Sequence, residues 1–386
     1  MRRIALLHPG APRRGARTGI LILLTLWLGF SVAAQAQPRF LTTSKLGYVP
    51  AAPTGKGSWI SRKIQAVRVR RSQRLLEKLE SSPQVGRRSL GNLFGLIKRG
   101  HYHNLVLGGT TGDGAPVTIV AGKHRRFPFV SQAGNWDNVQ VKVGDRSYAI
   151  NRADLPRLSI TFEGKGETRR IQLAYDGPLA EQQSGSHAMA DFHRTRLPSP
   201  ANKGTTAASL RLELDARSLG MLPMGLAGVV GMEYFPRKVE GTGTLSIGGR
   251  RVALRKVGGE METGRMSNLS AHRAVTAVYD YQGLTTADGT GHVSFTGRGA
   301  GSGKTSKLAR VTDRVFDGIA RVAGTRQFGL DAQGIRHDQP LSPAEGRIVA
   351  YDVVQFPNGV ALERRVVEAR DAQGKAYRGL QERFFK

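Results

Sequence analysis

The amino-acid sequence predicts an all-β protein in which two antiparallel β-barrels follow a basic N-terminal leader. The first observation is an internal repeat, because six residues between positions 108 and 122 recur 175 positions later. The repeated residues are Gly108, Thr110, Thr111, Asp113, Gly114 and Gly122, and their counterparts are Gly283, Thr285, Thr286, Asp288, Gly289 and Gly297. Each copy is typical of two strands joined by an Asp-Gly turn, which supplies the positive φ of a tight hairpin. A second echo, Ala174-Tyr175-Asp176 against Ala350-Tyr351-Asp352, nearly keeps this register. The repeat predicts a duplicated β domain.

The second observation is a series of thirteen short segments of alternating polarity that starts after His101. They cover residues 104–108, 116–121, 138–143, 158–163, 170–175, 209–214, 229–234, 241–247, 251–257, 274–281, 291–296, 346–354 and 361–369. Turn residues such as Gly248-Gly249 join them. Many short strands are typical of barrels, since closure removes exposed edges. Residues 181–206, which contain Gly185, Pro198, Pro200 and Asn202, predict a long loop.

The third observation sets the first 36 residues apart as an export signal. Five arginines precede a short apolar run, residues 20–34, and Ala34-Gln35-Ala36 has the small-x-small pattern of a cleavage site. Retention of this run as a membrane anchor is the alternative. The chain has no cysteine, so burial alone has to stabilise an exported protein. The expected units are residues 1–36 as signal peptide, 37–100 as basic leader, 101–225 as first barrel and 226–386 as second barrel.

The basic leader holds a large share of the charge. Residues 37–100 contain 14 Lys and Arg against Glu77 and Glu80 alone. Residues 60–79 predict a helix with Ile60, Ile64, Val67, Leu75 and Leu79 near one side. Its cations, Arg62, Lys63, Arg70, Arg71, Arg74 and Lys78, are candidates for binding an anionic membrane surface or lipopolysaccharide. The alternative is a solvated basic helix packed on the first barrel. Export argues against nucleic acid as the partner.

A family resemblance rests on short motifs in the C-terminal half. They are Met232-Glu233-Tyr234, the hairpin from Glu240 to Gly249, the segment from Gly259 to Arg265, and Tyr377 to Phe384. In these motifs the chain resembles an uncharacterised tandem lipocalin-like family, distantly similar to carotenoid hydratase, AttH and tocopherol cyclase proteins. The resemblance implies two lipocalin-like β-barrels side by side. Where such relatives have an acidic residue followed by tryptophan, this chain has Glu262 and then Thr263.

The same segment provides the candidate catalytic residues, which are Glu260, Glu262 and Arg265. We expect them to point toward a barrel mouth together with candidate ligand-binding residues Tyr234, Tyr279 and Tyr281. A carboxyl group in a desolvated mouth would be able to protonate an alkene or carbonyl. The alternative is a structural Glu262–Arg265 ion pair with tyrosines packed between sheets.

Two other motifs are predicted not to bind cofactors. His101 and His103, or His187, Asp191 and His193, are too few ligands for a metal site, so we predict none. Gly303-Lys304-Thr305 resembles a phosphate-binding loop, but Arg298 stands where its first glycine is required, so we predict no nucleotide. Residues 307–322 fit either an amphipathic helix or a hairpin.

These observations favour an exported protein that binds a hydrophobic or amphipathic ligand, lipid-like or isoprenoid-like, without a cofactor. One alternative is a cofactor-free hydratase or isomerase that acts on such a molecule with Glu260 or Glu262 as the acid. Another is an envelope-interaction protein whose basic leader binds an anionic glycolipid. A wide apolar cavity would favour the first two hypotheses, and filled barrels with an exposed basic stripe would favour the third.

Overall fold

The structure is a computed structural model that describes most of the strands and one helix. The described residues are 49–81, 99–125, 135–150, 157–188, 204–224, 232–267, 279–286, 292–298, 326–331, 334–336, 345–355, 361–370 and 373–385. Within these ranges no helix is both long and apolar enough to cross a bilayer. The predicted signal, the phosphate-loop lookalike and residues 307–322 lie outside the described residues.

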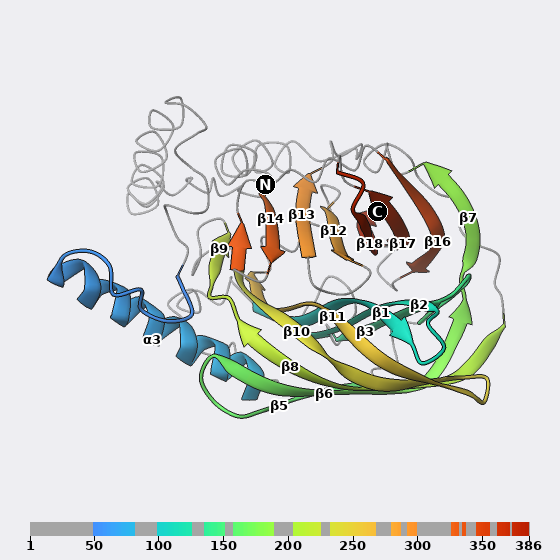
Figure 1. Ribbon diagram of the computed structural model, residues 1–386, viewed down its shortest axis with the longest axis horizontal. Helices are drawn as coiled ribbons and strands as arrows, with labels where there is room; N and C mark the ends of the chain where they lie inside the picture. The colour runs from blue at the N-terminus through green and yellow to red at the C-terminus, as the bar shows by residue number, and fades with distance from the viewer. Residues whose placement is uncertain are drawn as a thin grey trace, which may run out of the picture.

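Eight antiparallel strands form a closed barrel (Figure 1). They are β1 (Arg99–Thr111), β2 (Pro116–Arg125), β3 (Trp136–Val143), β4 (Arg146–Ala149), β6 (Thr168–Glu181), β8 (Thr205–Ser218), β10 (Met232–Ile247) and β11 (Arg250–Ser267). They pair in that order, and β11 closes the barrel by pairing with both β10 and β1. Two short strands lie beside it: β5 (Leu158–Glu163) pairs with β6, and β9 (Leu222–Met224) pairs with β10.

Local sequence explains the hairpins of this barrel. Gly114 has a φ of 85° at the β1–β2 turn, and Gly248 and Gly249 have φ of 57° and 82° at the β10–β11 turn. These left-handed conformations favour glycine, so the two turns predicted from Asp113-Gly114 and Gly248-Gly249 are confirmed. In β8, buried and exposed residues alternate along the strand, as expected where one face meets a core.

Apolar side chains fill the middle of the barrel interior. Its core cluster includes Leu105, Leu107, Ile119, Val141, Leu173, Leu212, Val239, Leu254 and Met261, each at most 1% exposed. Such packing stabilises a barrel through area removed from water, about 25 cal/mol per Å². Among the described residues, the middle of the barrel is therefore a packed core and not the wide apolar cavity that would favour the first two hypotheses, so a ligand site in this barrel has to lie at an end.

A second sheet of eight antiparallel strands packs against one side of the barrel (Figure 1). Its order is β15 (Gly334–Arg336), β14 (Arg326–Asp331), β13 (His292–Arg298), β12 (Tyr279–Thr286), β18 (Ala376–Phe385), β17 (Ala361–Arg370), β16 (Glu345–Gln355) and β7 (Gln183–Ala188). The all-β prediction is confirmed. The repeated segments occupy matching places, since β1–β2 lies next to β11 and β12–β13 lies next to β18.

The chain crosses between the two sheets, which changes the expected organisation. The strands β10 and β11 fall in the unit expected at 226–386, yet they complete the first barrel. The strand β7 lies within the loop predicted at 181–206, yet it pairs with β16 in the second sheet. Because β7 follows β6 after the single residue Gln182, one stretch of chain joins the barrel to the sheet. Prediction of a loop there was wrong for residues 183–188.

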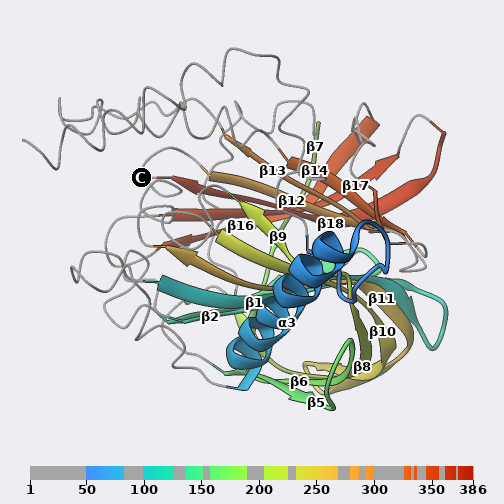
Figure 2. The ribbon, with the colours of Figure 1, turned by 90° about the vertical axis from the view of Figure 1, so that its left-hand side faces the viewer.

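The predicted leader helix is confirmed as α3 (Trp59–Ser81), which lies across one end of the barrel (Figure 2). Its buried residues are Val69, Ser72, Leu76 and Leu79. Of the five apolar residues expected near one side, Ile60, Ile64 and Val67 are exposed, whereas Leu79 is 1% exposed. Only the C-terminal half of the helix has a barrel surface to pack against, so the helix carries two separate apolar faces.

Candidate functional site

The open end of the barrel contains a hollow of about 690 Å³. It lies among the turns that join β1 to β2, β3 to β4 and β10 to β11. Its apolar wall consists of Val143, Tyr148, Leu245, Ile247 and Val252. Leu245 and Tyr148 belong to the barrel core, and Val143 and Ile247 pack against it, so this wall continues the core outward. The volume lies within the usual range for small-molecule sites.

The rim of the hollow is polar and carries both signs of charge. It includes Arg146, Arg250, Asp113 and Glu181. A hydrogen bond to the Tyr148 side chain raises the pKa of the Arg146 guanidinium, and the Glu181 charge adds to this effect. A hydrogen bond from Thr111 lowers the pKa of Asp113, and Arg250 contributes in the same direction. The hollow therefore combines an apolar wall with a rim that carries charges of both signs.

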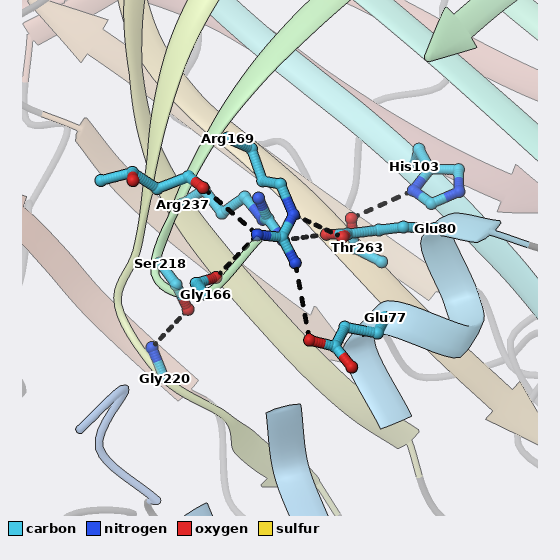
Figure 3. A network of polar contacts seen from close by, with 10 residues as sticks. Glu77, Glu80, His103, Gly166, Arg169, Ser218, Gly220, Arg237 and Thr263 are labelled. Carbon is cyan, nitrogen blue, oxygen red and sulfur yellow. Dashed lines mark hydrogen bonds and ion pairs between the residues drawn. The ribbon is translucent and has the colours of Figure 1, made fainter. Parts of the chain in front are cut away.

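The opposite end of the barrel is closed by α3. Leu76 and Leu79 pack on Phe235 of β10. Glu80 follows them and forms ion pairs with Arg237, which is fully buried, and with Arg169, whose Nε lies 3.1 Å from Glu80 Oε2. Figure 3 shows Arg169 between Glu80 and the more exposed Glu77. Burial lowers the pKa of Arg237 to about 10. In the described part of the chain, α3 therefore covers this end of the barrel.

His103 lies beneath this helix end, inside the barrel. Its Nδ1 is 3.0 Å from Thr263 Oγ1, and its ring contacts Phe162. Burial, and then the nearby His101, lower the pKa of His103 to about 3. The rings of His101 and His103 have centroids 6.3 Å apart. Within the described part of the chain, no group of three or more potential metal ligands gathers.

Three predicted site residues meet on the outer face of the barrel. Glu260 and Glu262 are two positions apart on β11, so their side chains share one face, and both are buried. The Tyr234 hydroxyl lies 2.5 Å from Glu260 Oε1 and 3.0 Å from Glu262 Oε1. Because a phenol has one proton, it donates to only one of these carboxyl groups at a time. The cluster is a buried acidic pair around one hydroxyl, and it lies away from the hollow.

The remaining predicted site residues do not join this cluster through any described contact. Arg265 lies on the opposite face of β11 and pairs with Glu233 of β10, at 2.7 and 3.0 Å. The proposed Glu262–Arg265 ion pair was therefore wrong, because odd and even residues of a strand face opposite sides. Tyr279 and Tyr281 belong to β12, where Tyr281 is in register with Glu382 of β18. Their side chains lie outside the described structure.

A cluster of polar residues between the barrel and the second sheet was not predicted from the sequence. Asn138 of β3 donates a hydrogen bond to Glu382 Oε1 at 3.0 Å, and Arg364 of β17 contacts Asn138 and pairs with Asp352 at 2.5 Å. Burial raises the pKa of Glu382 to about 7, although the Arg364 charge opposes this effect. No periodic signal in the sequence marks Glu382, because its burial arises from the contact between the two sheets.

No protein-family model matches the chain, and no curated protein has a matching sequence. Solved structures give similarities of low identity. A protein assigned as AttH from Nitrosomonas europaea is 11% identical with a TM-score of 0.34, covering 74% of this chain and 92% of that one. CghA with Sch210972 is 11% identical with a TM-score of 0.34, covering 79% of this chain and 94% of that one. Kievitone hydratase from Nectria haematococca is 9% identical with a TM-score of 0.31, covering 74% of this chain and 88% of that one.

Proposed function

We propose that this chain is an exported β-barrel protein that binds a hydrophobic or amphipathic small molecule, lipid-like or isoprenoid-like, at the open end of its closed barrel. The observation that carries this proposal is the hollow of about 690 Å³ whose wall continues the barrel core. The apolar part of the ligand packs on Leu245, Ile247 and Val252. Its polar end lies at the rim, within reach of Arg146 and Arg250.

The rim also limits the chemistry of the ligand. Arg146 and Arg250 are exposed, and Glu181 and Asp113 are their nearest described carboxylates around the hollow. An anionic head would compete with these carboxylates for the arginines, whereas an uncharged alcohol, amide or carbonyl adds to the existing hydrogen bonds. We therefore expect a ligand with an uncharged polar end.

A pair of substitutions on one strand tests this site. Val252→Arg directs a cation into the hollow without creating a void in the core, because Val252 lies at its wall and is partly exposed. Ala253→Arg introduces the same cation on the exposed opposite face of β11. Native mass spectrometry of the purified proteins should show a retained small molecule in wild type and Ala253→Arg, and loss of it in Val252→Arg. Equal occupancy in all three proteins would place the ligand elsewhere.

A second candidate function, cofactor-free acid catalysis, is supported by the contacts of Tyr234 with Glu260 and Glu262. In this alternative, one of the two carboxyl groups donates a proton to an alkene or carbonyl, and the Tyr234 hydroxyl donates a hydrogen bond to the other carboxyl group. The substrate would have to lie between barrel and second sheet, because the cluster faces away from the barrel interior. The test incubates the molecule recovered from the protein with wild type and with Glu262→Gln. Conversion by wild type alone supports catalysis, and no conversion by either protein supports binding only.

A further inference from the structure

The exposed half of α3 has the features of a surface that contacts something apolar. Of the described residues, the large hydrophobic side chains left exposed are Trp59, Ile60, Ile64 and Val67, at 62, 63, 56 and 57%. All four lie within nine consecutive residues of one helix. At about 100° per residue they fall within roughly 140° of arc, on the side away from Val69, Ser72, Leu76 and Leu79. Figure 1 shows this end of α3 extending beyond the barrel strands, at the left of the view.

Basic side chains share the same arc. Lys63, Arg70, Arg71, Arg74 and Lys78 are all exposed, and the first acidic residue of the helix is Glu77. The Lys63 ammonium lies 3.9 Å from the centre of the Trp59 ring. The exposed face is therefore apolar near its N-terminal end and strongly cationic along its whole length.

We propose that this face of α3 docks the protein on an anionic lipid bilayer. Ile60, Ile64, Val67 and Trp59 enter the boundary between headgroups and acyl chains, and the cations contact lipid phosphates. Charge complementarity alone would also suit a soluble polyanion. The exposed apolar side chains favour the bilayer, because a polyanion in water offers them no apolar environment.

The other half of the helix links this surface to the barrel. Leu76 and Leu79 are buried against Phe235, and Glu80 pairs with Arg169 and Arg237. These contacts hold the helix as a rigid arm, so docking orients the whole barrel relative to the bilayer. Docking on a bilayer does not depend on what the barrel binds, because none of these residues lines the hollow at its open end.

Tryptophan fluorescence tests the proposal in the protein as it accumulates in its producing cells. The sequence has three tryptophans, so Trp27→Phe leaves exposed Trp59 and buried Trp136. Mixing with phosphatidylcholine vesicles that contain phosphatidylglycerol should move the emission to shorter wavelength. Pure phosphatidylcholine vesicles should produce little change. An unchanged emission with anionic vesicles would overturn the proposal.

Matched variants separate the apolar and cationic contributions. The triple change Ile60→Ser, Ile64→Ser and Val67→Ser should weaken vesicle binding on the order of a hundredfold, since three apolar side chains no longer leave water. Replacing Lys63, Arg70 and Arg74 by serine should weaken it roughly fivefold per charge. The same replacement of exposed Arg251, Arg255 and Lys256, at the far end of the barrel, is the control and should have little effect.

Two results would contradict docking through this face. One is vesicle binding that is unchanged in the triple serine variant, which would assign binding to another part of the chain. The other is full competition by soluble polyphosphate without any change in Trp59 emission, which would indicate a polyanion partner. Circular dichroism of each variant checks the fold, and the exposed positions make unfolding an unexpected outcome.

Discussion

At the residue scale, the buried ionisable groups lie at contacts between elements far apart in sequence. Arg237 lies inside the barrel, and its described ion-pair partner, Glu80, comes from the leader helix. Glu382 is held by Asn138 across the contact between the barrel and the second sheet. Breaking a buried pair by removing one partner usually costs several kcal/mol, so these groups tie the elements together.

Two buried groups, Glu382 and His103, make the free energy of unfolding change with pH in opposite directions. Glu382 has its pKa raised from 4.5 to about 7, so between these values the unfolded chain releases a proton that the folded protein keeps, and stability falls as pH rises. His103 has its pKa lowered from 6.5 to about 3, so between these values the unfolded chain binds a proton that the folded protein does not, and stability rises with pH. From pH 4.5 to 6.5 the two contributions oppose each other.

Glu382→Gln should therefore steepen the rise of stability with pH, because the contributions of His103 and of His124, whose pKa burial also lowers, remain unopposed by Glu382. We expect the free energy of unfolding to increase more steeply in the variant than in wild type from pH 4.5 to 6.5, by about 1.4 kcal/mol per pH unit. Urea unfolding over this range provides the measurement. Glu213→Gln, on the exposed face of β8, is the control and should follow wild type. Parallel pH profiles for Glu382→Gln and wild type would show that Glu382 is not desolvated.

The candidate site could be predicted from sequence only as far as local spacing reaches. Glu260 and Glu262 lie two residues apart in a strand, so alternation alone places them on one face. The contact with Tyr234 depends on the pairing of β10 with β11. The turn residues Gly248-Gly249 predict this pairing, because they join the two strands in a hairpin. The partner of Arg265 was not predicted correctly. Glu262 is close to Arg265 in sequence but lies on the other face of β11, whereas Glu233 lies opposite Arg265 on the neighbouring strand β10.

At the element scale, α3 combines a buried half and an exposed half. The helix prediction from periodicity succeeded, but periodicity does not tell which apolar residues meet a partner. Leu79 lies against Phe235 because the barrel end is beside it, whereas Val67 lies on the other side of the helix. The strand β7 was predicted as a loop, because Gln183–Ala188 is polar and contains a glycine. These residues form a strand through their pairing with β16, which lies far away in the sequence.

The two halves of α3 should respond differently to the same truncation. Leu79→Ala removes a side chain that is 1% exposed and should lower the free energy of unfolding by roughly 2–5 kcal/mol. Val67→Ala removes apolar surface that is 57% exposed and should change it by less than about 0.5 kcal/mol. Chemical denaturation of both variants checks this. Similar losses in both would mean that the exposed half is covered in solution.

At the scale of the whole molecule, the barrel and the second sheet are interlocked by chain crossings. The strands β10 and β11 complete the barrel after the expected boundary at residue 225, and β7 enters the second sheet before it. The fold class was predictable because alternation and turn residues are local. The exchange of strands was not, since it depends on which edges pair across long sequence distances.

Cutting the chain after residue 225 should not separate the two parts. A specific protease site inserted there leaves β10 hydrogen-bonded to β8 and β11 hydrogen-bonded to β1 across the cut. After cleavage, size-exclusion chromatography should show both fragments eluting together without denaturant. Elution of two separate folded fragments would contradict the strand pairing described here.

Native mass spectrometry of the protein purified from its producing cells shows whether a ligand occupies the open end of the barrel. We predict that wild type and Ala253→Arg retain a stoichiometric hydrophobic or amphipathic molecule, and that Val252→Arg has lost it. A wild-type protein that carries no such molecule, or a Val252→Arg protein that carries it undiminished, would contradict the claim.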